Sequence, residues 1–217
     1  VDAHAERVGG HHNLHAVEAE VVLVEPPLVV RQPGVVARYA VPLGAQPVAH
    51  RLDLLAGGAV EIDATFLYAD MANSSKMAKE LDRRVAAKIL KSFLATTARL
   101  VRYHDGSIVS FDGDRILGVF MGDSKNTVAA KCGLQIKYVV QQIIRPKFEA
   151  KYESVKDASF TISHGVGIDT GTVLAVRAGA RGDNDLIWIG RAPNLAAKMS
   201  DLRESPYHTF ITATVYN

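Results

Sequence analysis

FLYADMANSS, at residues 66–75, decides the fold of this 217-residue chain. The run begins as a nearly continuous apolar stretch, which is typical of a buried strand. It ends in Ser74 and Ser75, residue types that favour the start of a helix. Asp70 lies where the strand gives way to the helix, and an unpaired carboxylate is costly to bury there. We expect a strand over residues 59–70, a helix after it and a functional carboxylate at the junction.

A second carboxylate lies in FDGDRILGVF, residues 111–120. Asp112-Gly113 is a strong hairpin signal between two short apolar runs. A long helical pattern separates the first strand from this hairpin, which gives the β-α-β-β order of a split βαβ unit. We expect the first strand to lie beside the hairpin, which brings Asp70 near Asp114. Two neighbouring carboxylates suit divalent-metal and polyphosphate chemistry.

Later patterns complete an α+β fold, a ferredoxin-like or palm-type βαββαβ core with additional C-terminal strands and a helix. The hairpin is followed by a helix with Asp123 as its N-cap, closed by Pro146, and then by a charged linker to about residue 158. The remaining expected elements are strands at 159–169 and 172–177 with a break at Gly171, a loop, a strand at 186–189, a helix at 193–203 and a strand at 208–215.

The composition changes sharply near residue 57. Five of the eight prolines and five of the eight histidines precede it, and the first lysine is Lys76. We interpret residues 1–57 as an N-terminal extension of undetermined structure and residues 58–217 as one domain that carries both carboxylates. His11, His12 and His15 have helical spacing, but no cysteine or well-placed carboxylate accompanies them, so we do not expect a metal site there.

The bulk composition argues against several classes of partner. The formal net charge is +2 and no long Lys/Arg run occurs, so we expect no nucleic-acid binding. No apolar stretch approaches the roughly 20 residues that cross a bilayer, and the N-terminus lacks a signal-peptide pattern. The single cysteine, Cys132, fits a reducing compartment and is expected to be buried in a helix. The sequence favours a cytoplasmic protein.

Asn194 and Lys198 are four residues apart in IGRAPNLAAKMSDL, so a helix places them on one face. Such a pair could hold a ribose or stabilise a transferring phosphate, but it is more often a solvated helix face. Asp70 taken alone could equally be a capping residue, and Asp114 a turn residue. The combination of the carboxylate pair with this helix indicates a nucleotide-using enzyme.

These motifs, in this order, resemble the class III nucleotidyl cyclase catalytic domain. FLYADMANSS and FDGDRILGVF resemble the two metal-binding strands of that family. GVGIDTGTVLAVRAG resembles its paired glycine-rich strands, and IGRAPNLAAKM resembles its asparagine-containing helix. Each motif alone is weak, but the four together cover nearly all of residues 59–217.

The resemblance implies two divalent cations, Mn²⁺ or Mg²⁺, held by Asp70 and Asp114 with help from the Met71 carbonyl. It implies attack of the ribose 3′-hydroxyl on the α-phosphorus with loss of pyrophosphate. The phosphates would lie against backbone N–H groups at a helix start. The residues expected to form this cradle are Asn73, Ser74 and Ser75.

The family also implies a head-to-tail homodimer in which each site takes residues from both subunits. Asn194 matches the family's ribose-orienting asparagine. Lys198 stands where the family usually has an arginine, and lysine cannot bind a phosphate bidentately. Arg177 would contact phosphate or stabilise the dimer. The final strand of the family, with its phosphate-contacting lysine, has no counterpart after TATVYN.

The base-reading positions depart from the adenylate cyclase pattern. Ser110 and Ile187 stand where adenine readers are expected, and isoleucine cannot hydrogen-bond a base. Tyr68 lies two residues before Asp70, and Arg115 adjoins Asp114; alternatively, they are an ordinary strand tyrosine and a surface arginine. A narrower resemblance is to the pyrimidine cyclases of bacterial Pycsar antiphage systems, which ties Tyr68 and Arg115 to pyrimidine selection. It implies conversion of UTP to cyclic UMP, a signal for a separate effector protein.

Three alternatives stay open from the sequence. The enzyme could be a cytidylate or adenylate cyclase with the same chemistry. The chain could be a non-catalytic nucleotide-binding regulatory domain, which the lysine at position 198 would suit. A phage-sensing scaffold built on residues 1–57 has only composition in its favour.

Overall fold

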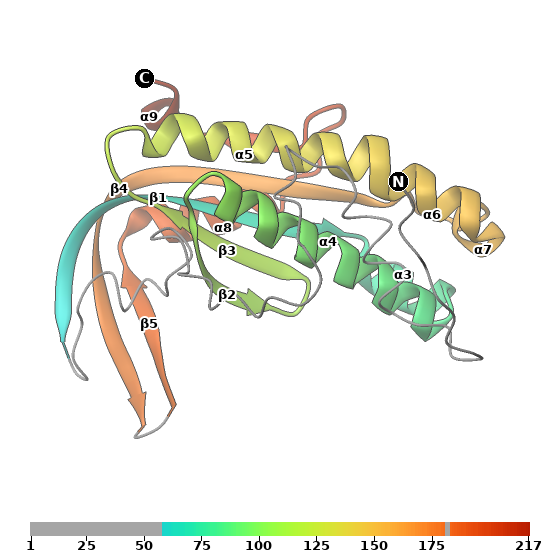
Figure 1. Ribbon diagram of the computed structural model, residues 1–217, viewed down its shortest axis with the longest axis horizontal. Coiled ribbons are helices and arrows are strands. Elements are labelled where there is room, and N and C mark those ends of the chain that lie inside the picture. Colours follow the sequence, from blue (N-terminus) through green and yellow to red (C-terminus); the bar gives the residue numbers. More distant parts are fainter. Residues whose placement is uncertain (1–57, 181–182) are drawn as a thin grey trace, which may run out of the picture.

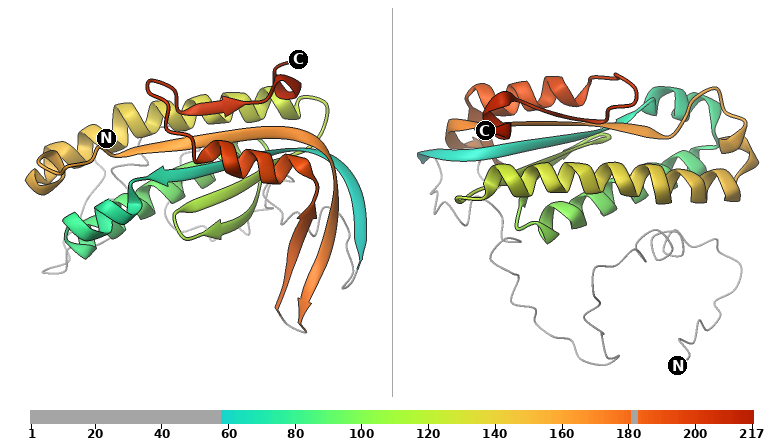
Figure 2. Two further views of the ribbon diagram at one scale, coloured as in Figure 1. Left: turned by 180° about the vertical axis from the view of Figure 1, so that it is seen from behind. Right: turned by 90° about the horizontal axis from the view of Figure 1, so that it is seen from above.

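Figure 1 shows the computed structural model, which describes residues 58–180 and 183–217. The predicted N-terminal extension and its three closely spaced histidines lie outside the described residues. The described part forms one curved, mainly antiparallel sheet with helices on both faces (Figures 1 and 2).

The long strand β1 (Ala59–Ala72) runs through the middle of the sheet. It pairs on one side with β3 (Arg115–Phe120), which continues to the edge strand β2 (Ser107–Asp112), and on the other with β4 (Ser163–Ala180). The resulting order β2-β3-β1-β4 is that of a split βαβ fold, so the predicted α+β core is confirmed. Beyond β4 lies β5 (Asp183–Ile189), and the short β6 (Thr209–Ile211) pairs in parallel with β4.

The helices divide between the two faces of the sheet. The long helices α4 (Arg83–Tyr103) and α5 (Lys125–Val139) cover one face, and α8 (Arg191–Ser200) covers the other (Figure 2). The other helices are short and include α3 (Ser74–Glu80), α7 (Glu153–Lys156) and α9 (Ala213–Tyr216). The start of β1, the end of β4 and β5 curl away from α4 and α5 as an arm (Figure 1).

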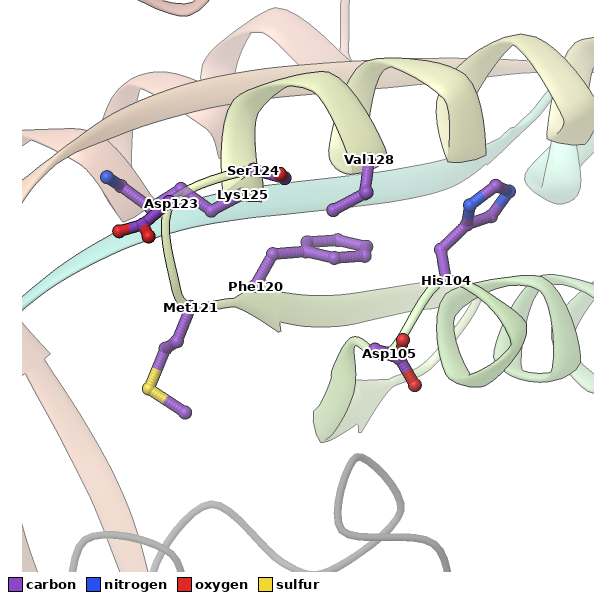
Figure 3. A pocket seen from close by; sticks show the side chains of 8 residues that line it. All are labelled: His104, Asp105, Phe120, Met121, Asp123, Ser124, Lys125 and Val128. Atoms are coloured by element: carbon purple, nitrogen blue, oxygen red, sulfur yellow. The ribbon is translucent and has the colours of Figure 1, made fainter.

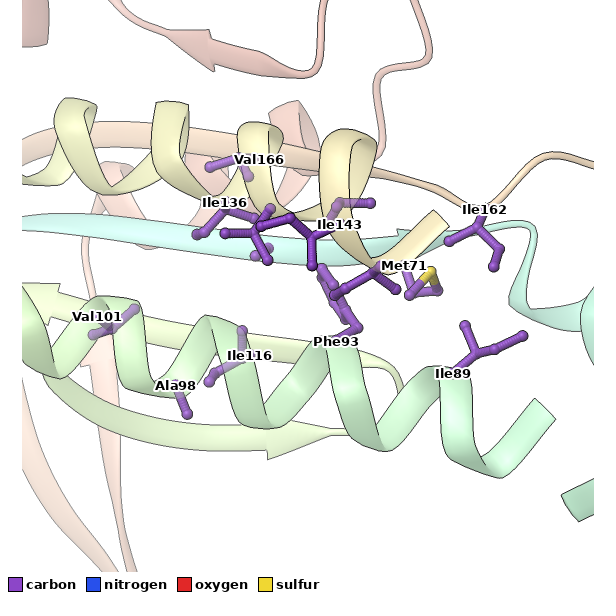
Figure 4. Packing of buried hydrophobic residues seen from close by; sticks show 14 of the residues in the cluster. Met71, Ile89, Phe93, Ala98, Val101, Ile116, Ile136, Ile143, Ile162 and Val166 are labelled. Atoms are coloured by element: carbon purple, nitrogen blue, oxygen red, sulfur yellow. The ribbon is translucent and has the colours of Figure 1, made fainter. Parts of the chain in front are cut away.

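The two faces enclose two hydrophobic clusters of different size. The larger cluster lies between the sheet and α4 and α5 and includes Phe93, Ile116 and Ile136 (Figure 4). The smaller cluster lies under α8, where the Phe66 and Trp188 rings meet edge to face at 5.2 Å. Cys132 is fully buried in the larger cluster, as the helical pattern predicts.

Alternation along β1 determines which face each side chain occupies. Leu67, Ala69 and Met71 pack into the larger cluster, whereas Phe66 and Tyr68 belong to the smaller one. Successive side chains of a strand point to opposite faces, so Asp70 falls on the α8 face with Tyr68. The strand therefore places the carboxylate opposite the main core.

The helix predicted to run continuously from residue 74 is in fact two helices. Leu81 is extended, with φ −100° and ψ 156°, and ends α3. Asp82 then caps α4, because its side chain accepts a 2.8 Å hydrogen bond from the Arg84 backbone N–H. Leu81 and Val85 are nevertheless both buried, so the apolar spacing predicted burial correctly but missed the break.

Pro146 does not close the second long helix, contrary to the prediction. A π-helical segment (Val140–Ile144) follows α5, and α6 (Arg145–Lys151) continues with Pro146 in its first turn. A proline in the first turn of a helix needs no backbone donor, so the chain stays helical through this position. The predicted charged linker is consequently α6 and α7. The residue that precedes α5 is Ser124, not the predicted Asp123.

The C-terminal strands also differ from the prediction. The two strands expected on either side of Gly171 form the single strand β4, because Gly171 adopts an extended conformation that is open to glycine, with φ 155°. The strand predicted at 186–189 begins earlier, at Asp183. The strand predicted at 208–215 is limited to β6, and α9 follows it. Within the described residues, no helix is both long and apolar enough to cross a membrane.

Candidate active site

Two rows of side chains cross the sheet on its α8 face. In the first row the register sets Asp70 of β1 opposite Arg115 of β3, which is opposite Asp112 of β2. In the second row Tyr68 is opposite Leu117, which is opposite Ser110. Directly opposite residues share a face of the sheet. Asp70 and Arg115 therefore share one row, and Tyr68 and Ser110 lie in the adjacent row.

The hairpin brings Asp114 next to Asp70, as the sequence predicts. The Met71 backbone N–H donates a 3.3 Å hydrogen bond to the Asp114 carbonyl. Gly113 in the turn has φ 58°, a left-handed conformation that glycine adopts without strain. The Asp112-Gly113 turn thus places the second carboxylate at the end of the first strand.

A pocket of about 390 Å³ opens at this end of the sheet. Seven of the eleven residues predicted for the site line it. Its lining residues are Asp70, Met71, Asn73, Ser74, Ser75, Lys76, Asp114, Arg115 and Arg203. The structure therefore gathers the residues predicted for the metals and the phosphate cradle, together with Arg115.

Asp70 is nearly buried, with only 5% of its surface exposed. Its Oδ1 accepts a 3.1 Å hydrogen bond from Arg115 Nε, and its Oδ2 accepts one of 2.6 Å from Arg203. Burial raises the pKa of Asp70, the nearby Asp114 carboxylate raises it further, and the two guanidinium groups lower it. The net shift of the Asp70 pKa is upward, which means that the ionised carboxylate is destabilised in the pocket. Additional positive charge would therefore stabilise it.

The segment after α8 supplies a second connection that sequence reasoning missed. Arg115 also donates a 2.5 Å hydrogen bond to Asp201 Oδ1, and Arg203 donates to Asp70. Arg203 lies 133 residues from Asp70 along the chain, and no spacing rule relates the two. Lys76, in the first turn of α3, also lines the pocket and was not predicted. The one sequence feature that could indicate a close approach of this segment is Gly165, on the strand β4 beside Asp70.

The donor set fits the divalent cations that the fold family implies. Two carboxylates, one of them nearly buried, face one pocket, and oxygen ligands are those that Mg²⁺ and Mn²⁺ prefer. Within the described residues, no group of three or more His, Cys, Asp or Glu side chains could hold a metal by itself. Any cation here would need further oxygen ligands, which substrate phosphates provide.

Tyr68 and Ser110 lie beside the pocket but do not line it. Tyr68 is half-buried against the smaller cluster, and burial raises the pKa of its hydroxyl, while Arg115 opposes that shift. Ser110 is half-buried on the edge strand β2. Ile187 lies on β5 and is 49% exposed.

Asn194 and Lys198 lie elsewhere on the surface of the same chain. Both are exposed on one side of α8, as their spacing predicts, and neither lines the Asp70 pocket. The Asn194 amide donates a 3.0 Å hydrogen bond to the Gly190 carbonyl at the start of its own helix. One chain does not bring this pair to the carboxylates.

A second pocket, of about 310 Å³, lies at the opposite end of β3 (Figure 3). The Phe120 ring lies between Asp123 on one side and His104 and Asp105 on the other (Figure 3). Lys125, which also lines it, is paired with Asp63 at 2.7 Å. None of the residues predicted for the site lies there, so the Asp70 pocket is the candidate active site.

Solved structures with a similar fold include adenylyl and guanylyl cyclases. A bacterial light-regulated adenylyl cyclase superposes with a TM-score of 0.65 at 21% identity, over 73% of this chain and 45% of that one. An adenylyl cyclase from P. aeruginosa superposes with a TM-score of 0.63 at 20% identity, over 73% and 81%. The fold is that of class III adenylyl and guanylyl cyclase domains, as the motifs predicted.

Sequence relatives narrow the family. The chain is 66% identical to a uridylate cyclase from Rhodovulum sp. (strain MB263) over 163 residues, which are 75% of this chain and 68% of the relative. It is 46% identical to a uridylate cyclase from Burkholderia cepacia over 154 residues, 71% of this chain and 65% of that one. The chain belongs to the uridylate cyclase family of nucleotidyl cyclases. It spans about two thirds of the length of these relatives.

No family model matches the chain. The prediction of a nucleotidyl cyclase, a phosphorus–oxygen lyase, is confirmed at the level of the family.

Proposed function

We propose that this protein converts UTP to 3′,5′-cyclic UMP and pyrophosphate. One observation carries the proposal: Asp70, Asp114 and Arg115 line a single pocket in a chain that is 66% identical to a uridylate cyclase. The pocket combines carboxylates for cations with guanidinium groups for phosphate or base. Such a combination suits a magnesium or manganese nucleoside triphosphate.

In this reaction the residues of the chain would bind the cations and the phosphates. When bound, two divalent cations would neutralise the triphosphate and lower the pKa of the ribose 3′-hydroxyl. Asp70, Asp114 and the Met71 carbonyl would hold those cations at the end of β1. Asn73, Ser74 and Ser75, which line the same pocket, would face the phosphates. The 3′-hydroxyl would release its proton to solvent, and its oxygen would attack the α-phosphorus in line. The bond from that phosphorus to the α–β bridging oxygen would break, and pyrophosphate would leave with its electron pair.

A head-to-tail homodimer would complete the site. Asn194 and Lys198 are exposed and lie outside the Asp70 pocket, so a second copy would have to bring them to it. The arm formed by β4 and β5 exposes Leu174, Ile187 and Ile189, by 37%, 49% and 57% of their surfaces. Apolar side chains gathered on one element commonly mark an interaction surface. We propose that this face meets the second copy.

Base selection would fall to the row of side chains next to the metals. Arg115 lines the pocket and lies close enough to Tyr68 to oppose the rise in its pKa. Tyr68 and Arg115 would read the pyrimidine, and Ser110, which shares the row of Tyr68, would offer a hydroxyl. Ile187 cannot hydrogen-bond a purine. The relatives' names support uracil over cytosine or adenine.

We further propose that cyclic UMP made in the cytoplasm signals to a separate effector in antiphage defence. The Pycsar resemblance of the motifs supports this role.

A product assay tests the proposal. The protein would be incubated separately with each of the four ribonucleoside triphosphates and Mn²⁺, and the products identified by mass spectrometry. We expect cyclic UMP to dominate. Cyclic CMP or cyclic AMP as the main product would contradict the base assignment, while the cyclase reaction would stand.

Substitution of the two aspartates separates an enzyme from a nucleotide-binding regulator. Asp70→Ala and Asp114→Ala should each abolish product formation while the protein stays folded by circular dichroism. Asp123→Ala, which removes an exposed aspartate at the second pocket, is the matched control and should retain activity. If neither site substitution changes product formation, the metal-dependent reading is wrong.

A further inference from the structure

Arg203 is fixed in place by the main chain of its own segment. Its NH1 group donates hydrogen bonds to the Ser200 carbonyl at 2.6 Å and the Leu202 carbonyl at 2.9 Å. Its NH2 group donates to Asp70 Oδ2 at 2.6 Å. The backbone carbonyls hold one end of the guanidinium, and the other end faces the pocket.

A glycine on the neighbouring strand makes room for this arrangement. Gly165 is opposite Asp70 in the β1–β4 register. A Cβ atom at position 165 would lie 2.5 Å from Arg203 NH1 and would collide with the Ser200 carbonyl oxygen. The end of α8 therefore rests directly on the strand backbone. Arg203 reaches Asp70 because this strand position carries no side chain.

The guanidinium retains donors for another ligand. Arginine has five N–H donors, and the three bonds to Ser200, Leu202 and Asp70 leave two. The Arg203 side chain is 39% exposed and lines the pocket beside Asp114. Two carboxylates and three cationic side chains share this lining, the latter being Lys76, Arg115 and Arg203. The pocket thus presents an excess of cations and suits a polyanion.

We propose that Arg203 is a substrate-binding residue that pairs with Asp70 when no cation is bound and with a phosphate of the triphosphate when cations are bound. Without cations it pairs with Asp70 Oδ2, while Arg115 pairs with Oδ1, so both oxygens of the nearly buried carboxylate have a cationic partner. When divalent cations take its place on Asp70, the same end of the guanidinium, still anchored on Ser200 and Leu202, binds a phosphate group. This inference rests on the proposed function only in taking a nucleoside triphosphate as the substrate.

The test separates binding of cations from binding of phosphate. Arg203→Gln removes the charge, Arg203→Lys keeps it without the planar fork, and Arg99→Gln removes an exposed arginine on α4 as a control. Binding of Mn²⁺ alone is measured from the free Mn²⁺ signal in electron paramagnetic resonance. Binding of inorganic tripolyphosphate in the presence of Mn²⁺ is measured by calorimetry.

We expect Arg203→Gln to bind Mn²⁺ alone about tenfold more tightly, because a competing cation at Asp70 is gone. We expect it to bind tripolyphosphate with Mn²⁺ at least about tenfold more weakly, because a charge-assisted hydrogen bond is lost. Arg203→Lys should fall between Arg203→Gln and the unaltered protein. Arg99→Gln should match the unaltered protein in both measurements.

Two results would overturn the proposal. Unchanged tripolyphosphate binding by Arg203→Gln would leave the residue as a counter-ion only. If the binding of Mn²⁺ and of tripolyphosphate weakened together, and the melting temperature fell in both Arg203 variants, the role of Arg203 would be purely structural. Binding of 3′-deoxy-UTP, which cannot cyclise, tests the proposed function separately: if the unaltered protein ignores it but binds tripolyphosphate, the base assignment fails while Arg203 is still tested.

Discussion

Gly165 of β4 lies opposite Asp70 of β1, and the Arg203 side chain passes over the glycine to reach the aspartate. The close approach of α8 to the strand depends on the missing side chain. Gly167, two residues further on, is in similarly close contact with the α8 backbone at Ala196 and Ser200. The two glycines therefore set how closely α8 rests on the sheet beside the candidate site.

Gly165→Ala should weaken binding of the triphosphate without unfolding the domain. The added methyl group would push the Ser200 carbonyl and Arg203 away from Asp70, so we expect at least a tenfold loss of affinity for 3′-deoxy-UTP with Mn²⁺. Isothermal titration calorimetry measures this loss. Gly133→Ala is the matched control: its methyl group would press on side chains of Thr209 and Ile168, away from the pocket. Equal losses in both variants would show that general overpacking, not the position of Arg203, is responsible.

Mixed dimers test whether a site takes residues from two subunits. Asp70→Ala and Asn194→Ala should each be inactive as pure proteins. If the proposed dimer forms, mixing them restores one intact site in each mixed dimer. Random exchange then gives about a quarter of the activity of the unaltered protein, since half of the dimers are mixed and half of their sites are intact.

Product formation by the mixture, with the pure variants as blanks, is the measurement. Absence of recovery after subunit exchange has been demonstrated by native mass spectrometry would contradict a shared site. Asn194 would then act, if at all, within its own chain.

Tyr68→Phe should reduce the preference for UTP while leaving the metal site intact. The substitution removes only the hydroxyl, and the ring continues to pack against the smaller cluster. Loss of one hydrogen bond to the base should lower kcat/KM for UTP about tenfold and leave the value for CTP or ATP less affected. Competition between UTP and CTP in one reaction measures the ratio directly. An equal fall for all nucleotides would exclude a role in base selection.

The sequence predicted the fold well where side-chain patterns are local. The apolar run of β1 and the Asp112-Gly113 turn together predicted that Asp70 lies near Asp114, and both residues line one pocket. The ends of the two long helices were predicted wrongly because the apolar pattern does not show where backbone hydrogen bonding changes. Asp82 caps a new helix after an apolar stripe that continues through the break, and a π-helical segment lets Pro146 remain in a helix. Hydrophobic spacing reports burial, not the continuity of backbone hydrogen bonds.

The long-range part of the site could not be read from spacing. Arg203 and Asp201 reach Asp70 and Arg115 only because α8 folds over the strand glycines. A glycine in a strand signals a close approach, but it does not name the residue that approaches. Asn194 and Lys198 show the complementary case, because their helical spacing and exposure were predictable, but neither residue lines the Asp70 pocket of the same chain.

Cys132 should resist alkylation in the folded protein. It is fully buried and unpaired, and burial raises the pKa of its thiol far above neutral, so almost no thiolate forms. Iodoacetamide at pH 8 should label it only after denaturant is added, as followed by mass spectrometry. Rapid labelling of the native protein would mean that α5 opens locally more often than its packing suggests.

His164 should make folding stability depend on pH. It is buried at 1% exposure, its ring stacks on His208 at 5.1 Å, and neither ring nitrogen has a hydrogen-bond partner among the described residues. Burial, with smaller contributions from nearby positive charge, lowers the pKa of His164 to about 3. The pKa of an unfolded histidine is about 6.5, so the unfolded state binds the proton more tightly. The full stability is therefore present above about pH 6.5 and is lost as the pH falls toward 3, by up to about 1.4 kcal/mol per unit.

His164→Phe should flatten that dependence, because a phenyl ring keeps the stack and cannot take up a proton. Urea unfolding at pH 7, 6 and 5 measures the free energy of unfolding for both proteins. We expect the difference between them to shift in favour of the variant at each lower pH. His104→Phe is the control, because that ring is half-exposed and hydrogen-bonded to Gln135 at 3.0 Å. Parallel pH profiles for His164→Phe and the unaltered protein would show that the folded protein takes up a proton on His164 as readily as the unfolded chain does.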